Sequence, residues 1–271
     1  GCFVHLDVAK PGGKQYNIPM SATDPDCPFP ETADIHTSSD EYATRFAGPA
    51  GQWMLDVQER ITLRMAARLP EATILDVGGG HGQLTLPLCR QGRPVTTVGS
   101  DESCRTRIRE AVEEGRCRFL VGNVIDLPLE DGSFDLVLCF RLLTHCERWP
   151  ELVRELCRVA RRGVIVDYPT SQSLNAVAPA LFGAKKKFEK NTRTWALFRH
   201  RQVVDEFARH GFAPVEIRKQ FFLPMVLHRM LNNRRLSAAM EAVCRGLGLT
   251  RLWGSPVIVL MMPRGERPET P

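Results

Sequence analysis

Short apolar runs alternate with amphipathic stretches from residue 73 to residue 262. The apolar runs are bounded by turn residues and have the length of buried strands, and they cover 73–77, 94–100, 117–121, 134–139, 163–168, 212–222 and 256–262. The stretches between them have helical spacing at 81–91, 102–114, 148–161 and 199–210. Strands joined through helices pair in parallel, and the helices cover the faces of the sheet. The pattern therefore predicts an α/β fold with a seven-stranded, mostly parallel sheet and helices on both faces.

The first 38 residues have a different pattern. Five prolines and the pair Gly12-Gly13 interrupt this stretch, and they disfavour regular helix. We expect residues 1–38 to form an extended arm and residues 39–271 to form a single domain. A long helix is expected after Gly48-Pro49, because apolar residues follow at helical spacing as far as Leu69.

Two segments do not fit the alternation of strands and helices. The segment 170–198 is longer than a usual connection between a strand and a helix, and 225–247 has a helical pattern between the last two strands. Connections of this kind often carry binding residues. We expect both segments to be cap insertions, the first of them over the carboxyl edge of the sheet.

The composition is that of a globular protein, with 43% hydrophobic and 25% charged residues among 271 and a net charge of +5. This mild positive charge favours an anionic substrate group over a nucleic-acid groove. No apolar run has the length of a membrane span, and the first residues lack the pattern of a secretory signal. Nine cysteines without a C-x-x-C pair indicate reduced thiols, a cytoplasmic location and no metal site.

A glycine-rich turn follows the first strand of the predicted sheet. It contains Gly78, Gly80 and Gly82, and Asp76 precedes it. Because glycine has no Cβ, such a turn can adopt positive φ angles and bring backbone N–H groups against a ligand. A carboxylate at this point would repel a phosphate and attract a cation. The turn therefore predicts a nucleotide-like ligand with a cationic part.

The spacing of the glycines distinguishes two nucleotide-binding motifs. A dinucleotide fingerprint G-x-G-x-x-G starting at Gly78 would require glycine at position 83, which is Gln83. Asp101 ends the second strand, where an acid can accept hydrogen bonds from both hydroxyls of a ribose. The alternative role of Asp101 is the N-cap of the helix 102–114. Asp101 thus supports an adenosine ligand without identifying it.

The order of these motifs resembles that of the class I S-adenosylmethionine-dependent methyltransferases, in particular the ubiquinone and menaquinone type. The resemblance covers roughly residues 42–168 and includes the stretches 119–128 and 132–138, which are similar to G-D-A-x-x-L-P and S-F-D-x-V. It implies S-adenosylmethionine as cofactor, S-adenosylhomocysteine as product and an antiparallel last strand. It also places Asn123 and Val124 at the adenine, with Asn123 in place of the usual acid, and Phe140 at the cofactor.

Several other residues are candidates with two interpretations each. His145, after the fourth strand, is either a general base or a packing residue. Tyr42, on a leading helix, either covers the cofactor or packs against the sheet. Three cations of the first cap either bind an anionic group of the substrate or form a solvated basic loop, and they are Lys186, Arg193 and Arg199.

These observations predict an enzyme that transfers a methyl group from S-adenosylmethionine to a small molecule, such as a sugar, lipid-linked or nucleotide-linked precursor with an anionic group. One alternative is a nucleic-acid methyltransferase. The sequence Cys139-Phe140-Arg141-Leu142 disfavours it, because an exocyclic-amine enzyme would have Asn or Asp followed by Pro-Pro there. The other alternative is a non-catalytic scaffold with the same fold. The sequence predicts no oligomeric state.

Overall fold

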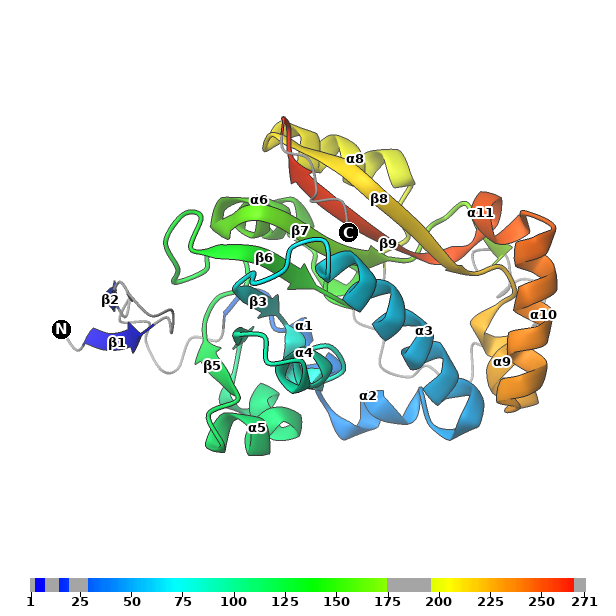
Figure 1. Cartoon of the computed structure of the whole chain (residues 1–271), viewed down its shortest axis with the longest axis horizontal. Helices are drawn as coiled ribbons and strands as arrows, with labels where there is room; N and C mark the ends of the chain where they lie inside the picture. Colours follow the sequence, from blue (N-terminus) through cyan, green and yellow to red (C-terminus); the bar gives the residue numbers. More distant parts are fainter. Residues whose placement is uncertain (1–2, 8–14, 20–28, 175–195, 266–271) are drawn as a thin grey trace.

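The computed structural model describes residues 3–7, 15–19, 29–174 and 196–265. Its main feature is a seven-stranded sheet with the order β5-β4-β3-β6-β7-β9-β8 (Figure 1). The strands are β3 (Ile74–Val77), β4 (Val95–Gly99), β5 (Cys117–Val121), β6 (Phe134–Cys139), β7 (Ala160–Tyr168), β8 (Phe212–Phe221) and β9 (Ser255–Pro263). A separate antiparallel pair consists of β1 (Phe3–Asp7) and β2 (Gln15–Pro19).

The pairing within the sheet confirms the predicted topology. The neighbours from β5 to β7 are all parallel, whereas β9 is antiparallel to both β7 and β8. All seven predicted strands are present. The carboxyl ends of the parallel strands meet at one edge of the sheet, as parallel pairing requires.

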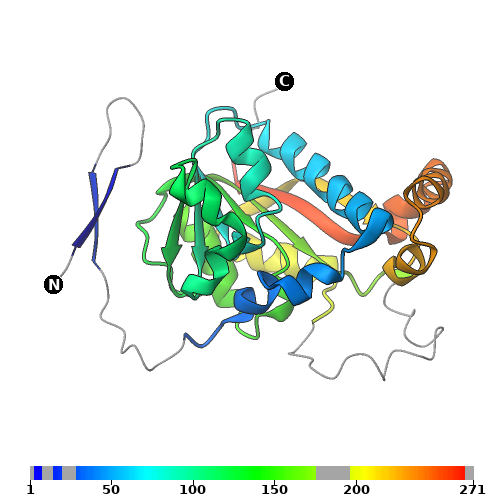
Figure 2. The ribbon, with the colours of Figure 1, turned by 90° about the horizontal axis from the view of Figure 1, so that it is seen from below.

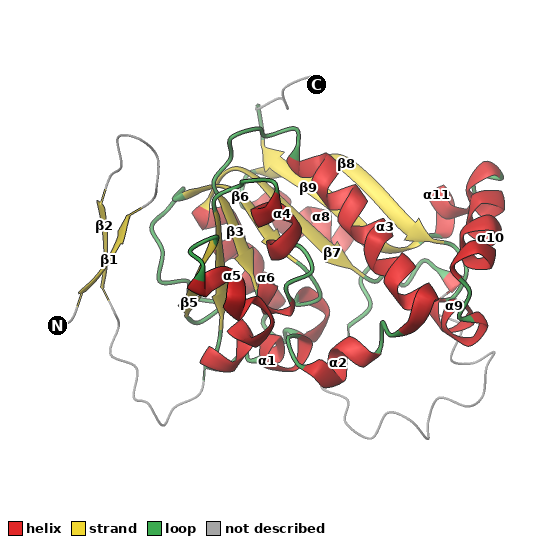
Figure 3. Cartoon of the chain, turned by 60° about the horizontal axis from the view of Figure 1, so that its bottom comes forward, coloured by secondary structure: helices red, strands yellow, loops and turns green. Residues whose placement is uncertain are grey.

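Helices cover both faces of the sheet (Figure 3). They are α1 (Ala33–Thr37), α2 (Asp40–Thr44), α3 (Gly48–Ala66), α4 (Thr85–Arg90), α5 (Arg109–Glu113), α6 (Trp149–Val159), α8 (His200–Arg209), α9 (Met225–Leu231), α10 (Arg234–Gly246) and α11 (Leu249–Trp253), with the 3-10 turns η1 (Gly79–His81), η2 (Glu102–Ile108) and η3 (Leu143–His145).

Alternate residues of the central strands enter two separate cores. On β6, Val137 and Cys139 pack with side chains of α6 and α8, whereas Leu136 and Leu138 pack with those of α3 and α4. Both sets are completely buried. This two-sided burial explains why the strands appear in the sequence as continuous apolar runs.

The expected helices differ from the observed ones around the glycine turn. Residues 81–91 were expected to form one helix, but Gly82 has a φ of 74° and α4 starts only at Thr85. A residue in the left-handed region cannot continue a right-handed helix, so the chain forms η1 first. Similarly, the expected helix 102–114 consists of η2 followed by α5.

Residues 33–37 were expected to belong to an extended arm, yet they form α1. This helix contacts η1 and η2 and lies with α2 beside the central sheet (Figure 2). Asp34 of α1 is completely buried, and its carboxylate accepts hydrogen bonds from the backbone N–H (2.5 Å) and the hydroxyl (2.6 Å) of Ser100. The burial of α1 results from this tertiary contact rather than from local sequence preference.

The two expected cap insertions have different outcomes. Residues 175–195 lie outside the described part of the chain, so the first insertion stays a prediction. The second contains α9 and α10, and α11 follows it before β9. Among the described residues, no helix is sufficiently long and apolar to cross a membrane.

Candidate functional site

The glycine turn links β3 to α4 and is closely packed on both sides. Gly78 has a φ of 73°, which favours glycine. A Cβ at Gly80 would lie 2.1 Å from the carbonyl oxygen of Cys104 and 2.8 Å from Oγ of Ser38. The turn therefore depends on glycine both for its φ angles and for the close approach of η2 and α1.

Asp76 lies beneath this turn and is completely buried. Its Oδ2 accepts a hydrogen bond from the hydroxyl of Thr85 at 2.7 Å, and a Cβ at Gly79 would collide with the carboxylate. Burial raises the pKa of Asp76 to about 7, and the hydrogen bond from Thr85 opposes this rise only in part. An acid with so little compensation is stabilised by a cation that binds next to it.

Four buried polar atoms around the turn have no hydrogen-bond partner among the described residues. They are Ser38 Oγ, Asp76 Oδ1, His81 Nε2 and Gln83 Oε1. Burial is the main cause that lowers the pKa of His81 well below 6.5, so its ring is neutral at pH 7. Buried polar groups normally have partners, and a group of four without them at one turn indicates a site for a polar ligand. This donor and acceptor set fits the methionine end of S-adenosylmethionine, which has an ammonium, a carboxylate and a sulfonium.

The residues expected at the adenosine lie at the ends of β4 and β5. Asp101 is exposed and its Oδ1 accepts from the backbone N–H of Ser103 at 2.8 Å, so it caps η2 as the alternative interpretation stated. Hydrogen bonds from the side chain and then from the backbone N–H of Ser103 lower the pKa of Asp101. Asn123 is half-buried, and its Oδ1 accepts from the N–H of Ile125 at 3.2 Å; Val124 is fully buried. Their contact with a cofactor stays a prediction.

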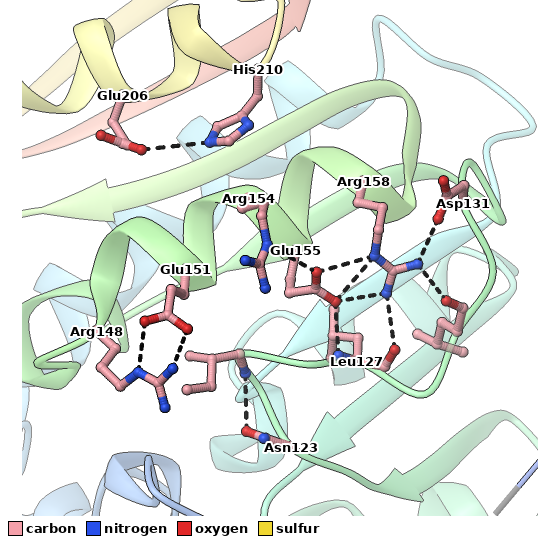
Figure 4. A network of polar contacts seen from close by, with 12 residues as sticks. Asn123, Leu127, Asp131, Arg148, Glu151, Arg154, Glu155, Arg158, Glu206 and His210 are labelled. Carbon is pink, nitrogen blue, oxygen red and sulfur yellow. Dashed lines mark hydrogen bonds and ion pairs between the residues drawn. The ribbon is translucent and has the colours of Figure 1, made fainter. Parts of the chain in front are cut away.

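An ion network around the buried Glu155 holds the loop that follows β5 (Figure 4). Oε2 of Glu155 accepts from the N–H of Leu127 at 2.9 Å, and Arg158 donates to the carbonyl of Leu127 at 2.9 Å. Arg158 also donates to both oxygens of Glu155 and to Asp131. The network fixes the backbone immediately after Asn123 and Val124.

Phe140 and Arg141 follow β6 and face different surroundings. The ring of Phe140 is buried in the same core as Leu138 and Leu88, so only its backbone is available at the carboxyl edge of the sheet. Arg141 has a φ of 60°, which is rare for a residue with a Cβ. Its backbone N–H donates to Oδ1 of Asp167 at 2.6 Å.

The side chain of Arg141 is surrounded by aromatic and polar groups of the leading helices. Its guanidinium lies 4.5 Å from the ring centre of Phe46 and 5.9 Å from that of Tyr42, and Nη2 donates to Oε1 of Gln58 at 3.3 Å. Nε2 of Gln58 donates to Oδ2 of Asp167 at 2.8 Å. Burial raises the pKa of Asp167 to about 6. The arrangement combines a half-buried cation, a buried acid and an amide that links them.

Tyr42 and His145 are close to this network. The buried ring of Tyr42 lies 6.4 Å from that of His145, edge to face, and burial raises the pKa of the Tyr42 hydroxyl. His145 is partly exposed at the end of η3. The structure thus places both predicted residues at the carboxyl ends of β6 and β7.

Only one of the three predicted cations of the first cap, Arg199, lies among the described residues. Lys186 and Arg193 lie outside the described residues. Arg199 is exposed at the N-cap of α8, where its backbone N–H donates to Oε1 of Gln202 at 2.8 Å. The described residues do place Arg141 in the site, and the guanidinium of Arg45 lies 4.7 Å from the ring centre of Tyr42.

The sequence analysis did not select several residues of the site, namely Asp34, Ser38, Gln58, Arg141 and Asp167. Asp167 gave a usable signal, since it ends a buried parallel strand, as Asp76 and Asp101 nearly do. Polar residues at such ends meet at one edge of the sheet. The residues on α1 and α3 had no such signal, because only tertiary packing brings these helices to that edge.

Residues 75–166 match the family described as "Methyltransferase domain". The chain is 31% identical over 125 residues to norajmaline N-methyltransferase of Rauvolfia serpentina, covering 43% of this chain and 42% of that protein. It is 31% identical over 126 residues to a ubiquinone biosynthesis O-methyltransferase of Caulobacter vibrioides, covering 44% and 50% respectively. The chain thus spans about half the length of these relatives.

The fold is similar to that of magnesium protoporphyrin IX methyltransferase from Synechocystis with bound S-adenosylhomocysteine. The TM-score is 0.59 at 15% identity, and the similarity covers 86% of this chain and 99% of that one. At this identity the similarity concerns the fold alone. It is consistent with the strand order and the antiparallel β9 described above.

Proposed function

We propose that the chain is a class I S-adenosylmethionine-dependent methyltransferase and that it transfers a methyl group from this cofactor to a small-molecule acceptor. The main support is the group of four unpartnered polar atoms around the glycine turn. The carboxylate of Asp76 can bind a cationic group of the cofactor. The other three atoms are neutral donors and acceptors for the rest of its methionine end. We propose Asp101, Asn123 and Val124 for the adenosine.

We propose that the acceptor binds over the carboxyl ends of β6 and β7. When bound, S-adenosylmethionine supplies a methyl group that is already activated. The protein then has to orient the acceptor and exclude water, and positioning alone can contribute on the order of 7–11 kcal/mol. Tyr42 and Phe46 present aromatic surface for this purpose. His145 takes the proton if the acceptor is a hydroxyl, and Asp167 positions Arg141 through the backbone.

We propose an acceptor class on the basis of the names of the relatives and the charge of the cap sequence. The two relatives are named for an N-methylation of an alkaloid and an O-methylation in ubiquinone biosynthesis, both of small molecules. We extend this to an acceptor with an anionic group, such as a sugar, lipid-linked or nucleotide-linked precursor. Support for the anion comes from two cations of the cap sequence, Lys186 and Arg193.

Two measurements test this function. Isothermal titration with S-adenosylhomocysteine should give a saturable heat; no heat at millimolar ligand would refute cofactor binding. Methyl-labelled S-adenosylmethionine should then label a compound in a small-molecule metabolite extract. Label that enters only added tRNA or DNA would refute the small-molecule acceptor while leaving the cofactor assignment intact.

Asp101→Ala is expected to weaken S-adenosylhomocysteine binding by about 1–3 kcal/mol, because the ribose hydroxyls lose their acceptor. Titration calorimetry measures the change in Kd. Glu102→Ala, which alters the exposed neighbouring acid, is the control and should bind like the wild type. An unchanged Kd for Asp101→Ala would leave the residue with only its helix-capping role.

Arg141→Gln is expected to lower the affinity for S-adenosylhomocysteine about 10- to 100-fold, the range of a charge-assisted hydrogen bond. Burial is the main cause of the pKa shifts of Asp76 and His81. The positive charge of Arg141 also lowers both pKa values, because its guanidinium is near the turn. The amino-acid end of S-adenosylhomocysteine has one group that attracts a guanidinium, its carboxylate, so this is the group that Arg141 is expected to bind.

The matched ligand is 5′-methylthioadenosine, which has the same nucleoside and thioether but no amino-acid end. Its affinity should be the same for the wild type and for Arg141→Gln. If the substitution weakened both ligands equally, Arg141 would act through the fold rather than through the carboxylate.

A further inference from the structure

The exposed apolar side chains are concentrated in one part of the molecule. Eleven large apolar side chains are exposed among the described residues, and seven of them lie between residues 230 and 253. These seven are Met230, Leu231, Leu236, Val243, Leu247, Leu252 and Trp253. They belong to α9, α10, α11 and the residues next to them, which lie together at one end of the molecule (Figures 1 and 2). We call this set the apolar patch.

The helix α10 has two distinct faces. Ser237, Glu241 and Cys244, at spacings of four and three, are buried against the rest of the chain. Leu236, Met240, Val243 and Leu247 form a second row at spacings of four, three and four. The exposed fractions of Val243 (63%) and Leu247 (70%) show that this row faces away from the core. Core packing therefore does not explain these apolar residues.

The charges in the same segment all have one sign at the surface. Residues 225–253 contain five arginines, all exposed, which are Arg229, Arg234, Arg235, Arg245 and Arg251. Glu241 is the single acid of the segment, and it is 1% exposed. Its carboxylate accepts from the backbone N–H groups of Phe222 and Leu223 and contacts His228. The exposed charges of this segment are thus all cationic, and one of them, Arg234, pairs with Asp56 of α3 at 3.0 Å.

We propose that α9–α11 form a docking surface for an anionic lipid bilayer. Leucine and tryptophan side chains beside arginines are typical of helices that lie in the membrane interface. The apolar side chains enter the boundary of the acyl chains, while the arginines contact lipid phosphates at the surface. A second copy of the chain fits less well, because a two-fold contact would place the arginines of both patches together.

The docking surface is separate from the glycine turn, so its test does not require methyl transfer. The intact protein is incubated with vesicles of equimolar phosphatidylglycerol and phosphatidylcholine, and with vesicles of phosphatidylcholine alone. We expect about tenfold more protein on the anionic vesicles in a sedimentation assay, and loss of most of this binding at about 0.5 M NaCl. Insertion of Trp253 should shift the fluorescence emission to the blue, and Trp253→Phe should remove that shift.

Two sets of variants separate the apolar and cationic contributions. Val243→Glu with Leu247→Glu should reduce vesicle binding about tenfold or more, as should Arg235→Glu with Arg245→Glu. The controls are Ile217→Glu on β8 and Arg201→Glu on α8, which change exposed residues outside the patch and should bind vesicles like the wild type. Unchanged binding of S-adenosylhomocysteine shows that each variant is folded.

Three results would overturn the proposal. The first is equal binding to both kinds of vesicle or to neither. The second is vesicle binding that the patch variants and the control variants change equally. The third is a concentration-dependent dimer in analytical ultracentrifugation that Val243→Glu with Leu247→Glu abolishes, combined with no vesicle binding, which would assign the patch to a second copy of the chain.

Discussion

Gly80→Ala is expected to lower the affinity for S-adenosylhomocysteine by at least about 100-fold, the cost of displacing a binding element by about 1 Å. The added Cβ would be 2.1 Å from the carbonyl oxygen of Cys104. A backbone oxygen cannot rotate away as a side chain can, so η1 and η2 must separate. Titration calorimetry measures the affinity, and far-UV circular dichroism verifies that the variant is folded.

The control for this experiment is Gly246→Ala at the end of α10. No heavy atom lies within 4 Å of the position that a Cβ would occupy there. It should bind S-adenosylhomocysteine like the wild type. If Gly80→Ala bound the ligand within about twofold of the wild type, close packing at the turn would not be what the cofactor requires.

Asp76→Asn is expected to remove most of the dependence of stability on pH between about 4 and 7. Burial raises the pKa of Asp76 from 3.8 to about 7 in the folded protein. Between these values the folded state holds a proton that the unfolded state has lost, so the free energy of unfolding falls as the pH rises. Above pH 7, ionisation of the buried Asp76 lowers the free energy of unfolding by its full amount, roughly 4 kcal/mol.

Urea unfolding of the ligand-free protein at a series of pH values measures this effect. The wild type should lose stability as the pH rises, and Asp76→Asn should lose much less. The part that remains should come from Asp167, because burial also raises its pKa, to about 6, so that its effect has the same sign. Asp205→Asn, at an exposed position on α8, should follow the wild type. Parallel curves for Asp76→Asn and the wild type would show that Asp76 is not the group responsible.

The strands could be predicted because burial on both faces makes each of them a continuous apolar run. The run 134–139 is an example, with all six residues buried and with its bounds correctly predicted. The acid before the turn and the left-handed glycines could also be predicted, because each follows from a local requirement. Asp101 likewise had two local interpretations, and the structure shows the helix-capping one.

The remaining part of the site depends on contacts between distant segments. Asp34 and Ser100 are 66 residues apart, and Gln58 and Asp167 are 109 residues apart. No periodicity reveals such a pair. Arg141 was equally hidden, because its importance comes from its contacts with α2, α3 and Asp167 and not from its neighbours in the sequence. The prolines before residue 33 suggested an arm that includes α1, although tertiary contacts override this preference.

The strand order has a consequence for the segment 75–166 that matches the family. That segment contains the strands from β3 to β7 almost completely, but β9 pairs with the outer edge of β7 and α1 supplies the acceptor for Ser100. Cut out alone, the segment would present an apolar edge strand with unpaired N–H and C=O groups, a template for aggregation. The region that defines the family by sequence is therefore smaller than the smallest part of the chain that could remain monomeric.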